Sequence, residues 1–167
     1  AGGRGYGEKG VFYYDANYKD YIDACEYLKI PYGFYFLEEA LNDTEIDEEV
    51  DFINKFLKEN AGKNCILPVA LDVEKHDGQG RADNIWNSRA ELVQKMIDKL
   101  NDKKINNILY TNAQTANLYL SDLKTDFWIA YYPEENKVPD YWYFDTKQEG
   151  ASNTKLQKRT IGWQFTE

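Results

Sequence analysis

Segments with helical periodicity alternate with short apolar runs along almost the whole chain, and this alternation restricts the fold more than any other feature. Strands that alternate with helices form right-handed β-α-β units around a parallel sheet. We therefore expect an α/β fold whose sheet is either doubly wound or closed into a barrel. The periodicity and its Gly and Pro boundaries predict helices over 15–30, 42–62, 85–100 and 113–120, and strands over 32–36, 65–74, 105–111, 127–132 and 160–165.

The length of 167 residues fits a single domain that spans residues 1–167. The Gly-rich segment 1–10 has no helical or strand period, and we expect it to form a loop. The polar segment 133–159 contains a Trp-Tyr-Phe cluster, which favours docking on the domain over disorder. No apolar run approaches the ~18 residues that cross a bilayer, so we expect no membrane span.

Composition excludes several classes of function. A net charge of −9 argues against a nucleic-acid surface, which needs clustered Lys and Arg. One His and two Cys are too few for a Cys/His zinc site, and no nucleophile-elbow motif accompanies His76, so we predict neither a metal nor another cofactor. Aromatic residues make up 16% of the chain, and 14 residues are Tyr. Aromatic faces with polar tips suit sugars, although Tyr also fills cores.

Two acidic residues close the apolar segment Val69–Glu74. Because side chains alternate along a strand, Asp72 and Glu74 share one face with Ala70, and the three aliphatic residues of the segment share the other. Barrel enzymes place catalytic groups at this C-terminal end of a strand, and mutual repulsion with partial burial raises the pKa of one acid of such a pair. The alternative is that the two acids cap a loop or pair with a Lys.

Further candidates lie near the ends of other predicted strands. We expect His76 to be a loop residue and Arg81 to cap a helix or form an ion pair. Cys25 and Cys65 are either two buried thiols or a disulfide. Four aromatic residues are candidates for stacking on sugar rings or, alternatively, for filling the core: Tyr35, Tyr110, Trp128 and Tyr132.

Six sequence segments, in order, resemble glycoside hydrolase family 25, the lysozymes (muramidases) of bacterial and phage origin. No single segment is specific, but together they extend over nearly the whole chain and favour a catalytic role for the paired acids. The segments are residues 3–7 followed by Asp15, and then 30–36, 67–74, 108–112, 127–132 and 162–166.

The resemblance implies a modified TIM-like β/α barrel that cleaves the β-1,4 bond between N-acetylmuramic acid and N-acetylglucosamine in peptidoglycan. It identifies Glu74 as the general acid and Asp72 as the group that orients the substrate's 2-acetamido group, whose carbonyl attacks the anomeric carbon. The four aromatic candidates would form the saccharide groove. Gln164 and Trp163 match a further family motif, and which of the two faces the pore stays open. The resemblance also implies an extracellular or cell-wall location and is compatible with a separate wall-binding module.

Two departures from the family pattern lead us to expect an incomplete barrel. Family members usually begin with an Asp-x-Ser strand and end with a Gly-x-x-Asp-x-Asn-like strand, and neither motif is present here. The alternatives to a muramidase are a non-catalytic cell-wall glycan-binding module and a parallel α/β hydrolase that acts on other glycans.

Overall fold

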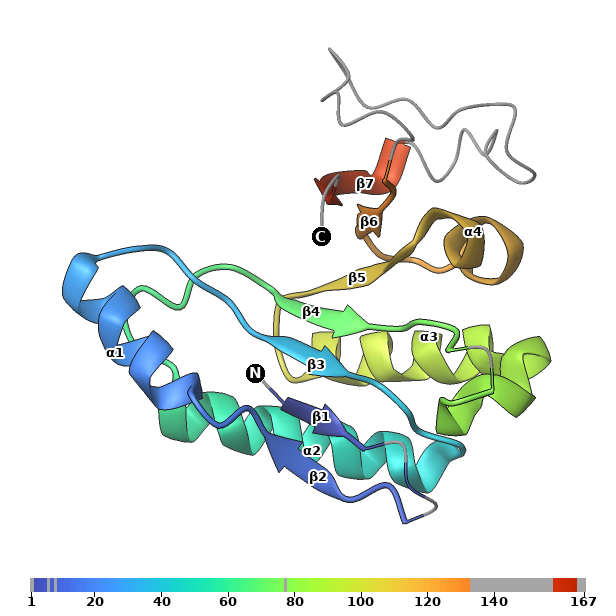
Figure 1. Cartoon of the computed structure of the whole chain (residues 1–167), viewed down its shortest axis with the longest axis horizontal. Coiled ribbons are helices and arrows are strands. Elements are labelled where there is room, and N and C mark those ends of the chain that lie inside the picture. The colour runs from blue at the N-terminus through green and yellow to red at the C-terminus, as the bar shows by residue number, and fades with distance from the viewer. Residues whose placement is uncertain (1, 6, 8, 77, 133–157, 165–167) are drawn as a thin grey trace.

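The computed structural model describes residues 2–5, 7, 9–76, 78–132 and 158–164, which form a seven-stranded sheet in the order β2-β1-β3-β4-β5-β6-β7 (Figure 1). β1 and β2 are antiparallel, and all other neighbouring strands are parallel. The mainly parallel sheet confirms the predicted α/β class. The strands are β1 Gly2–Arg4, β2 Phe12–Tyr14, β3 Tyr35–Leu37, β4 Val69–Asp72, β5 Asn107–Asn112, β6 Phe127–Ala130 and β7 Thr160–Gln164.

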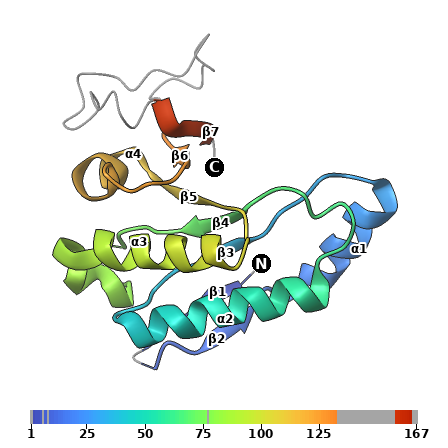
Figure 2. The ribbon, with the colours of Figure 1, turned by 180° about the vertical axis from the view of Figure 1, so that it is seen from behind.

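Two long helices, α2 and α3, cover one face of this sheet (Figure 2). Asn42 caps α2 by accepting a hydrogen bond from the backbone N–H of Glu45 at 3.0 Å. Apolar side chains of both helices pack on the aliphatic face of β3–β6 and form the core. The helical segments are α1 Tyr18–Leu28, α2 Asp43–Asn60, the 3₁₀ turn η1 Arg81–Ile85, α3 Trp86–Asp102, α4 Ala113–Thr115 and the π turn η2 Ala116–Leu120.

The prediction of a loop over residues 1–10 is wrong, because Gly2–Arg4 forms β1 between β2 and β3. The glycines are required by close backbone contacts. A Cβ on Gly2 would lie 2.5 Å from the carbonyl oxygen of Tyr13, and one on Gly3 would lie 2.5 Å from Leu37 Cβ. The low strand propensity of Gly is therefore overridden by packing.

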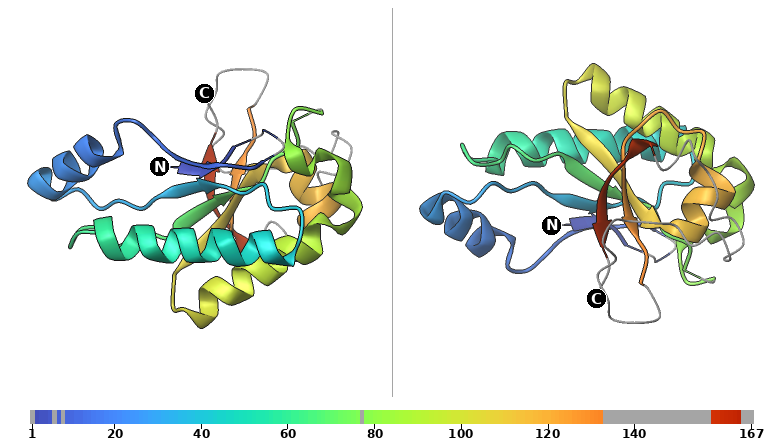
Figure 3. Two further views of the ribbon diagram at one scale, coloured as in Figure 1. Left: turned by 90° about the horizontal axis from the view of Figure 1, so that it is seen from below. Right: turned by 90° about the horizontal axis from the view of Figure 1, so that it is seen from above.

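Helix α1 differs from its prediction in two ways. It begins at Tyr18 after Asn17, while Asp15 accepts the Asn17 N–H at 2.9 Å in the preceding turn. No α1 residue is buried, although the helical period of 15–30 places apolar residues on one face, and two of them, Tyr21 and Leu28, are 61% and 60% exposed. Figure 3 shows why, since α1 extends past the strands to one side of the sheet.

The other strands and helices lie close to their predicted positions. β4 is shorter than predicted because it begins after Pro68 and ends at Asp72, so Glu74 lies two residues beyond the strand. Within the described part of the chain, β2 and β7 form the edges of the sheet, so the barrel is not closed, in agreement with the expectation of an incomplete barrel. The predicted docking of 133–159 falls almost wholly outside the described residues.

Candidate active site

The strand register brings one polar and two aromatic side chains into a row across the face of the sheet opposite α2 and α3. Asp72 of β4 is level with Tyr110 of β5, Tyr110 is level with Trp128 of β6, and Trp128 is level with Gly162 of β7. Paired residues of neighbouring strands point to the same face. They line a groove of about 800 Å³ bounded by Gly33, Phe34, Tyr35, Leu67, Pro68, Ala70, Asp72, Ile108, Tyr110, Trp128, Ile161, Gly162, Trp163 and Gln164.

The predicted alternation along β4 is confirmed. Val69, Leu71 and Val73 belong to the core under the helices, whereas Ala70 and Asp72 line the groove. Asp72 and the aliphatic residues Val69, Leu71 and Val73 therefore face opposite sides of the sheet.

The aromatic wall of the groove is held by packing and by one hydrogen bond. The rings of Tyr110 and Trp128 meet edge to face, with centroids 5.1 Å apart. A Cβ on Gly162 would lie 3.1 Å from the Trp128 ring, so this glycine leaves the space that the indole occupies. The Tyr110 hydroxyl donates to Gln164 Oε1 at 2.9 Å, which fixes the phenol against β7.

The ionised form of the Asp72 carboxyl group is disfavoured by its surroundings. Burial, reinforced by the charges of Glu74 and Glu39, raises its pKa from 3.8 to about 7. Its Oδ1 is buried and has no hydrogen-bond partner among the described residues. A buried acceptor without a donor destabilises the protein until a ligand supplies one.

Glu74 follows β4 beside this group. Burial raises its pKa, and the nearby charge of His76 offsets part of that rise. Glu74 in turn contributes, after burial, to the raised pKa of Tyr110. Two interacting carboxyl groups and a phenol thus lie together where β4 and β5 end.

The remaining residues that were predicted to line the groove differ in how close they lie to it. Tyr35 lines the groove, but it is the first residue of β3, level with Ala70, and so does not lie near the C-terminal end of its strand as predicted. Tyr132 lies beyond β6, is 44% exposed, and reaches the Tyr110 phenol, whose pKa it helps to raise. Both Trp163 and Gln164 contribute to the groove lining.

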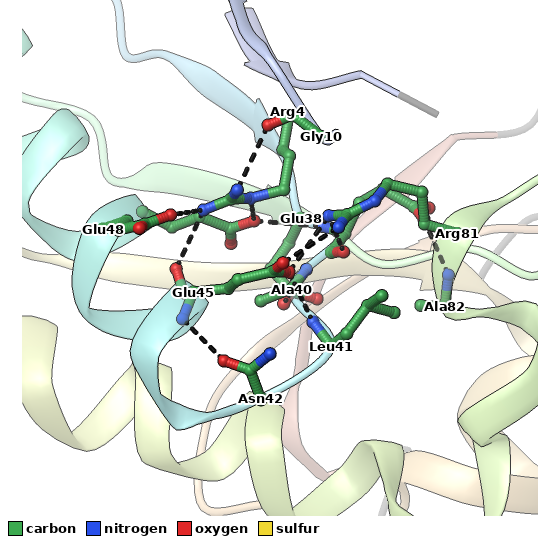
Figure 4. A network of polar contacts seen from close by, with 12 residues as sticks. Arg4, Gly10, Glu38, Ala40, Leu41, Asn42, Glu45, Glu48, Arg81 and Ala82 are labelled. Carbon is green, nitrogen blue, oxygen red and sulfur yellow. Dashed lines mark hydrogen bonds and ion pairs between the residues drawn. The ribbon is translucent and has the colours of Figure 1, made fainter. Parts of the chain in front are cut away.

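A buried network of ion pairs supports the strand ends from the helix side (Figure 4). Arg4 of β1 donates through Nε to Glu49 at 2.7 Å, and Arg81 pairs with Glu45 at 2.9 Å, which confirms the prediction of an ion pair for Arg81. Burial raises the pKa of Glu49 well above its ordinary range. Because these groups come from β1, α2 and η1, the network fixes the relative positions of elements that end near the groove.

A second part of the network lies directly behind Asp72. Arg89 of α3 forms an ion pair with Glu38, whose backbone N–H donates to the Asp72 carbonyl at 3.0 Å. Both side chains are almost fully buried, at 1% and 0% exposed. The pair therefore fixes the end of β3 against the end of β4.

Sequence reasoning missed Glu39 as a member of the site. Its side chain is 1% exposed, its Oε1 lies 3.8 Å from His76 Nε2, and its Oε2 accepts the Ala82 N–H at 3.0 Å. The signal was available, since Glu39 follows β3 by two residues just as Glu74 follows β4. Carboxyl groups that follow neighbouring parallel strands gather at one edge of the sheet.

Other expectations concern ligands and thiols. Among the described residues, no group of three His, Cys, Asp or Glu side chains is arranged to hold a metal ion. Within the same residues, no helix is both long and apolar enough to cross a membrane. Cys25 and Cys65 are free thiols and only partly buried, so the disulfide alternative is wrong, as is full burial.

Two solved structures share this fold. The spore cortex lytic enzyme SleM of Clostridium perfringens matches 99% of this chain and 52% of its own, with a TM-score of 0.73 and 22% identity. The modular autolysin LytC of Streptococcus pneumoniae matches 78% of this chain and 32% of its own, with a TM-score of 0.64 and 21% identity. LytC has also been solved in complex with a synthetic peptidoglycan ligand. The chain thus spans about half of the SleM chain and about a third of the LytC chain.

A search of curated proteins gave no significant match. By contrast, the sequence profile of glycosyl hydrolases family 25 matches residues 8–167, which include every strand from β2 to β7 and both Asp72 and Glu74. The chain belongs to glycosyl hydrolases family 25.

Proposed function

We propose that this chain is the catalytic part of a lysozyme-type glycosidase that cleaves the β-1,4 bond between N-acetylmuramic acid and N-acetylglucosamine in peptidoglycan. The observation that carries the proposal is the pair Asp72 and Glu74, two carboxyl groups with raised pKa values beside an aromatic groove. Family membership supports glycosidase chemistry, and the related folds belong to an autolysin and a cortex lytic enzyme.

Asp72 lines the groove, and in this proposal it orients the substrate. The N–H of a 2-acetamido group supplies the donor that the buried Oδ1 lacks among the described residues. With the amide held in this way, its carbonyl oxygen attacks the anomeric carbon as the glycosidic bond breaks. Glu74 donates its proton to the leaving oxygen, and an oxazolinium ion forms with retention at the end of the cycle. The Asp72 carboxylate stabilises the positive charge of that ion.

The hydrogen bond from the acetamido N–H to Asp72 also favours protonation of Glu74, the proposed general acid. In the free protein Asp72, with a pKa of about 7, competes with Glu74 for protons. An N–H donated to Asp72 favours its ionised form, and the resulting negative charge raises the proton affinity of Glu74. Substrate binding therefore moves the pair toward an ionised Asp72 and a protonated Glu74. After the first step Glu74 takes a proton from the water that opens the oxazolinium ring.

The groove supplies binding without long-range electrostatic attraction. A net charge of −9 gives no steering toward anionic cell walls, so recognition depends on local stacking and hydrogen bonds. Trp128 and Tyr110 present fixed aromatic edges and faces, and Tyr35 extends the aromatic surface along β3. Wall-binding modules elsewhere in the protein would add affinity at its extracellular or cell-wall location.

The test is cleavage of purified peptidoglycan, followed by turbidity and by mass spectrometry of the released fragments. We expect the wild type to release fragments with N-acetylmuramic acid at the reducing end and Glu74→Gln to release none while still binding insoluble walls. Glu59→Gln, which changes an exposed glutamate on α2, is the matched control and should cleave normally. Wild-type binding without cleavage would refute the enzyme and favour a glycan-binding module.

A further inference from the structure

A tyrosine side chain lies next to Asp72 across the sheet, but its hydroxyl proton is used elsewhere. The strand register places two residues level with Asp72, Leu37 on β3 and Tyr110 on β5. Level residues of neighbouring strands point to the same face, and the strands are about 4.8 Å apart. Leu37 has no polar hydrogen, so of these two described neighbours only Tyr110 has a side-chain donor to offer Asp72. Asp72 Oδ1 is nevertheless buried without a hydrogen-bond partner among the described residues.

Gln164 on β7 accounts for this missing hydrogen bond. The Tyr110 hydroxyl has a single proton and donates it to Gln164 Oε1 at 2.9 Å. Gln164 is level with Ala130 of β6, and β6 separates β5 from β7 in the sheet. The phenol therefore extends across β6 toward β7, whereas Asp72 lies on the other side of β5.

The acceptor and the phenol ring are both held in place. The Gln164 carbonyl accepts the backbone N–H of Tyr131 at 3.0 Å, and the neighbouring Trp163 donates through Nε1 to the Tyr131 carbonyl at 2.9 Å. The ring of Tyr110 packs edge to face on Trp128, with centroids 5.1 Å apart. Ring packing and the hydrogen bond thus act together to keep the hydroxyl directed at Gln164.

We propose that Gln164 is a positioning residue that holds the Tyr110 hydroxyl away from Asp72 and so keeps Oδ1 of Asp72 open for the acetamido N–H of the substrate. The inference rests on the proposed function, in which that N–H is the missing donor. A phenol that donated to Asp72 would satisfy the buried oxygen in the free protein, and the substrate would then have to displace it. With Gln164 in place, the hydrogen bond to Oδ1 forms only when substrate binds, and its free energy contributes to binding.

Removal of the Gln164 acceptor tests this role. In Gln164→Met the hydroxyl is free to turn toward Asp72, so we expect KM for solubilised glycan strands of peptidoglycan to rise about tenfold, the effect of one hydrogen bond. The value of kcat should change little, because the reacting groups are arranged as in the wild type once substrate has displaced the phenol. Gln94→Met is the matched control. Gln94 also accepts one hydrogen bond, from the Lys124 N–H at 2.8 Å, but lies on α3, which covers the opposite face of the sheet, so KM should not change.

Removal of the hydroxyl separates this role from simple anchoring of the phenol. Tyr110→Phe keeps the ring but leaves no hydroxyl that could donate to Asp72, so it should bind substrate more tightly than Gln164→Met. The double variant should recover the KM of Tyr110→Phe alone. If Gln164 only anchored the phenol, the two single variants would weaken binding equally and the second substitution would restore nothing. Absence of rescue, or a wild-type KM in Gln164→Met, would therefore overturn the inference.

A stability measurement tests the same contact without reference to activity. In Gln164→Met the phenol should stabilise the Asp72 carboxylate, so Asp72→Asn should raise the urea midpoint at about pH 8 less in this background than in the wild type. An equal rise in both backgrounds would contradict the inference and leave the proposed function standing. Gln164→Asn, whose amide is one methylene further from the phenol, gives the same comparison if Gln164→Met does not fold. If the wild type does not cleave peptidoglycan, the proposed function fails, and the urea midpoints still decide whether Gln164 keeps the phenol from Asp72.

Discussion

Replacement of Asp72 by asparagine should stabilise this protein while abolishing its activity. Asparagine has the shape of the protonated acid but carries no ionisable charge. Below pH 3.8 the folded and unfolded chains both hold a neutral Asp72, so wild type and Asp72→Asn should be equally stable there. As the pH rises above this value, Asp72 ionises in the unfolded chain before it ionises in the folded chain, because its pKa is raised only in the folded state.

The structure sets the size of the effect. A rise in pKa from 3.8 to about 7 costs the folded wild type roughly 4 kcal/mol once Asp72 is ionised in both states, at about 1.4 kcal/mol per unit. The excess stability of Asp72→Asn should therefore grow as pH rises from 3.8 and level off above about 7. For a chain of this length, that plateau corresponds to a rise in Tm of roughly 10 °C.

Urea unfolding followed by circular dichroism from about pH 4 to about pH 8 measures this difference. Asp23→Asn removes an exposed carboxyl group from α1, and its stability curve should run parallel to that of the wild type. A variant that is less stable than wild type at about pH 8 would refute the reasoning, because Asp72 would then be a structural partner. Gain of stability with loss of activity is the signature of a group retained for function.

Three smaller changes test the groove and its support. Gly162→Ala should displace the Trp128 ring, which lies 3.1 Å from the added Cβ, and should weaken binding to insoluble walls several-fold in a sedimentation assay without loss of fold. Tyr110→Phe removes the hydroxyl that anchors the phenol to β7 and should cost about 1 kcal/mol of unfolding free energy, measured in urea. Arg89→Met leaves Glu38 buried without its partner and should cost about 3–5 kcal/mol at neutral pH, with partial recovery at lower pH as the carboxyl group is protonated.

The sequence predicted the parallel sheet and the two faces of β4 because both depend on local patterns. The segment Val69–Val73 alternates with a period of two, and the structure buries its aliphatic residues under α2 and α3. Register then follows from the strand order, which brings Tyr110 and Trp128 beside Asp72. Alternation predicted the faces of β4, whereas the assignment of the aromatic residues to a saccharide groove came from the family resemblance, and the strand order comes from the structure.

Features that depend on contacts between distant residues were not predictable in this way. β1 is a strand because Gly3 fits against Leu37, a contact 34 residues away along the chain that no local propensity records. The apolar stripe of α1 is a correct helical pattern, but periodicity does not reveal whether a partner covers it. Glu39 was missed because its role depends on a loop from the next strand, which carries His76 to within 3.8 Å.

The unequal environments of Asp72 and Glu74 predict different pH profiles for kcat/KM and kcat. The proposed mechanism needs an ionised Asp72 and a protonated Glu74, so activity should fall on the acid side as Asp72 is protonated and on the alkaline side as Glu74 loses its proton. In kcat/KM, which reports the free protein, the acid limb should lie near the Asp72 pKa of about 7. In kcat, which reports the complex, the acetamido N–H bound to Oδ1 favours the carboxylate, so the acid limb should move to lower pH. A hydrogen bond from the acetamido N–H to Oδ1 would account both for the lack of a partner on this oxygen in the free protein and for the lower pH of the acid limb in kcat. An acid limb at the same pH in both profiles would show that Asp72 does not receive that bond.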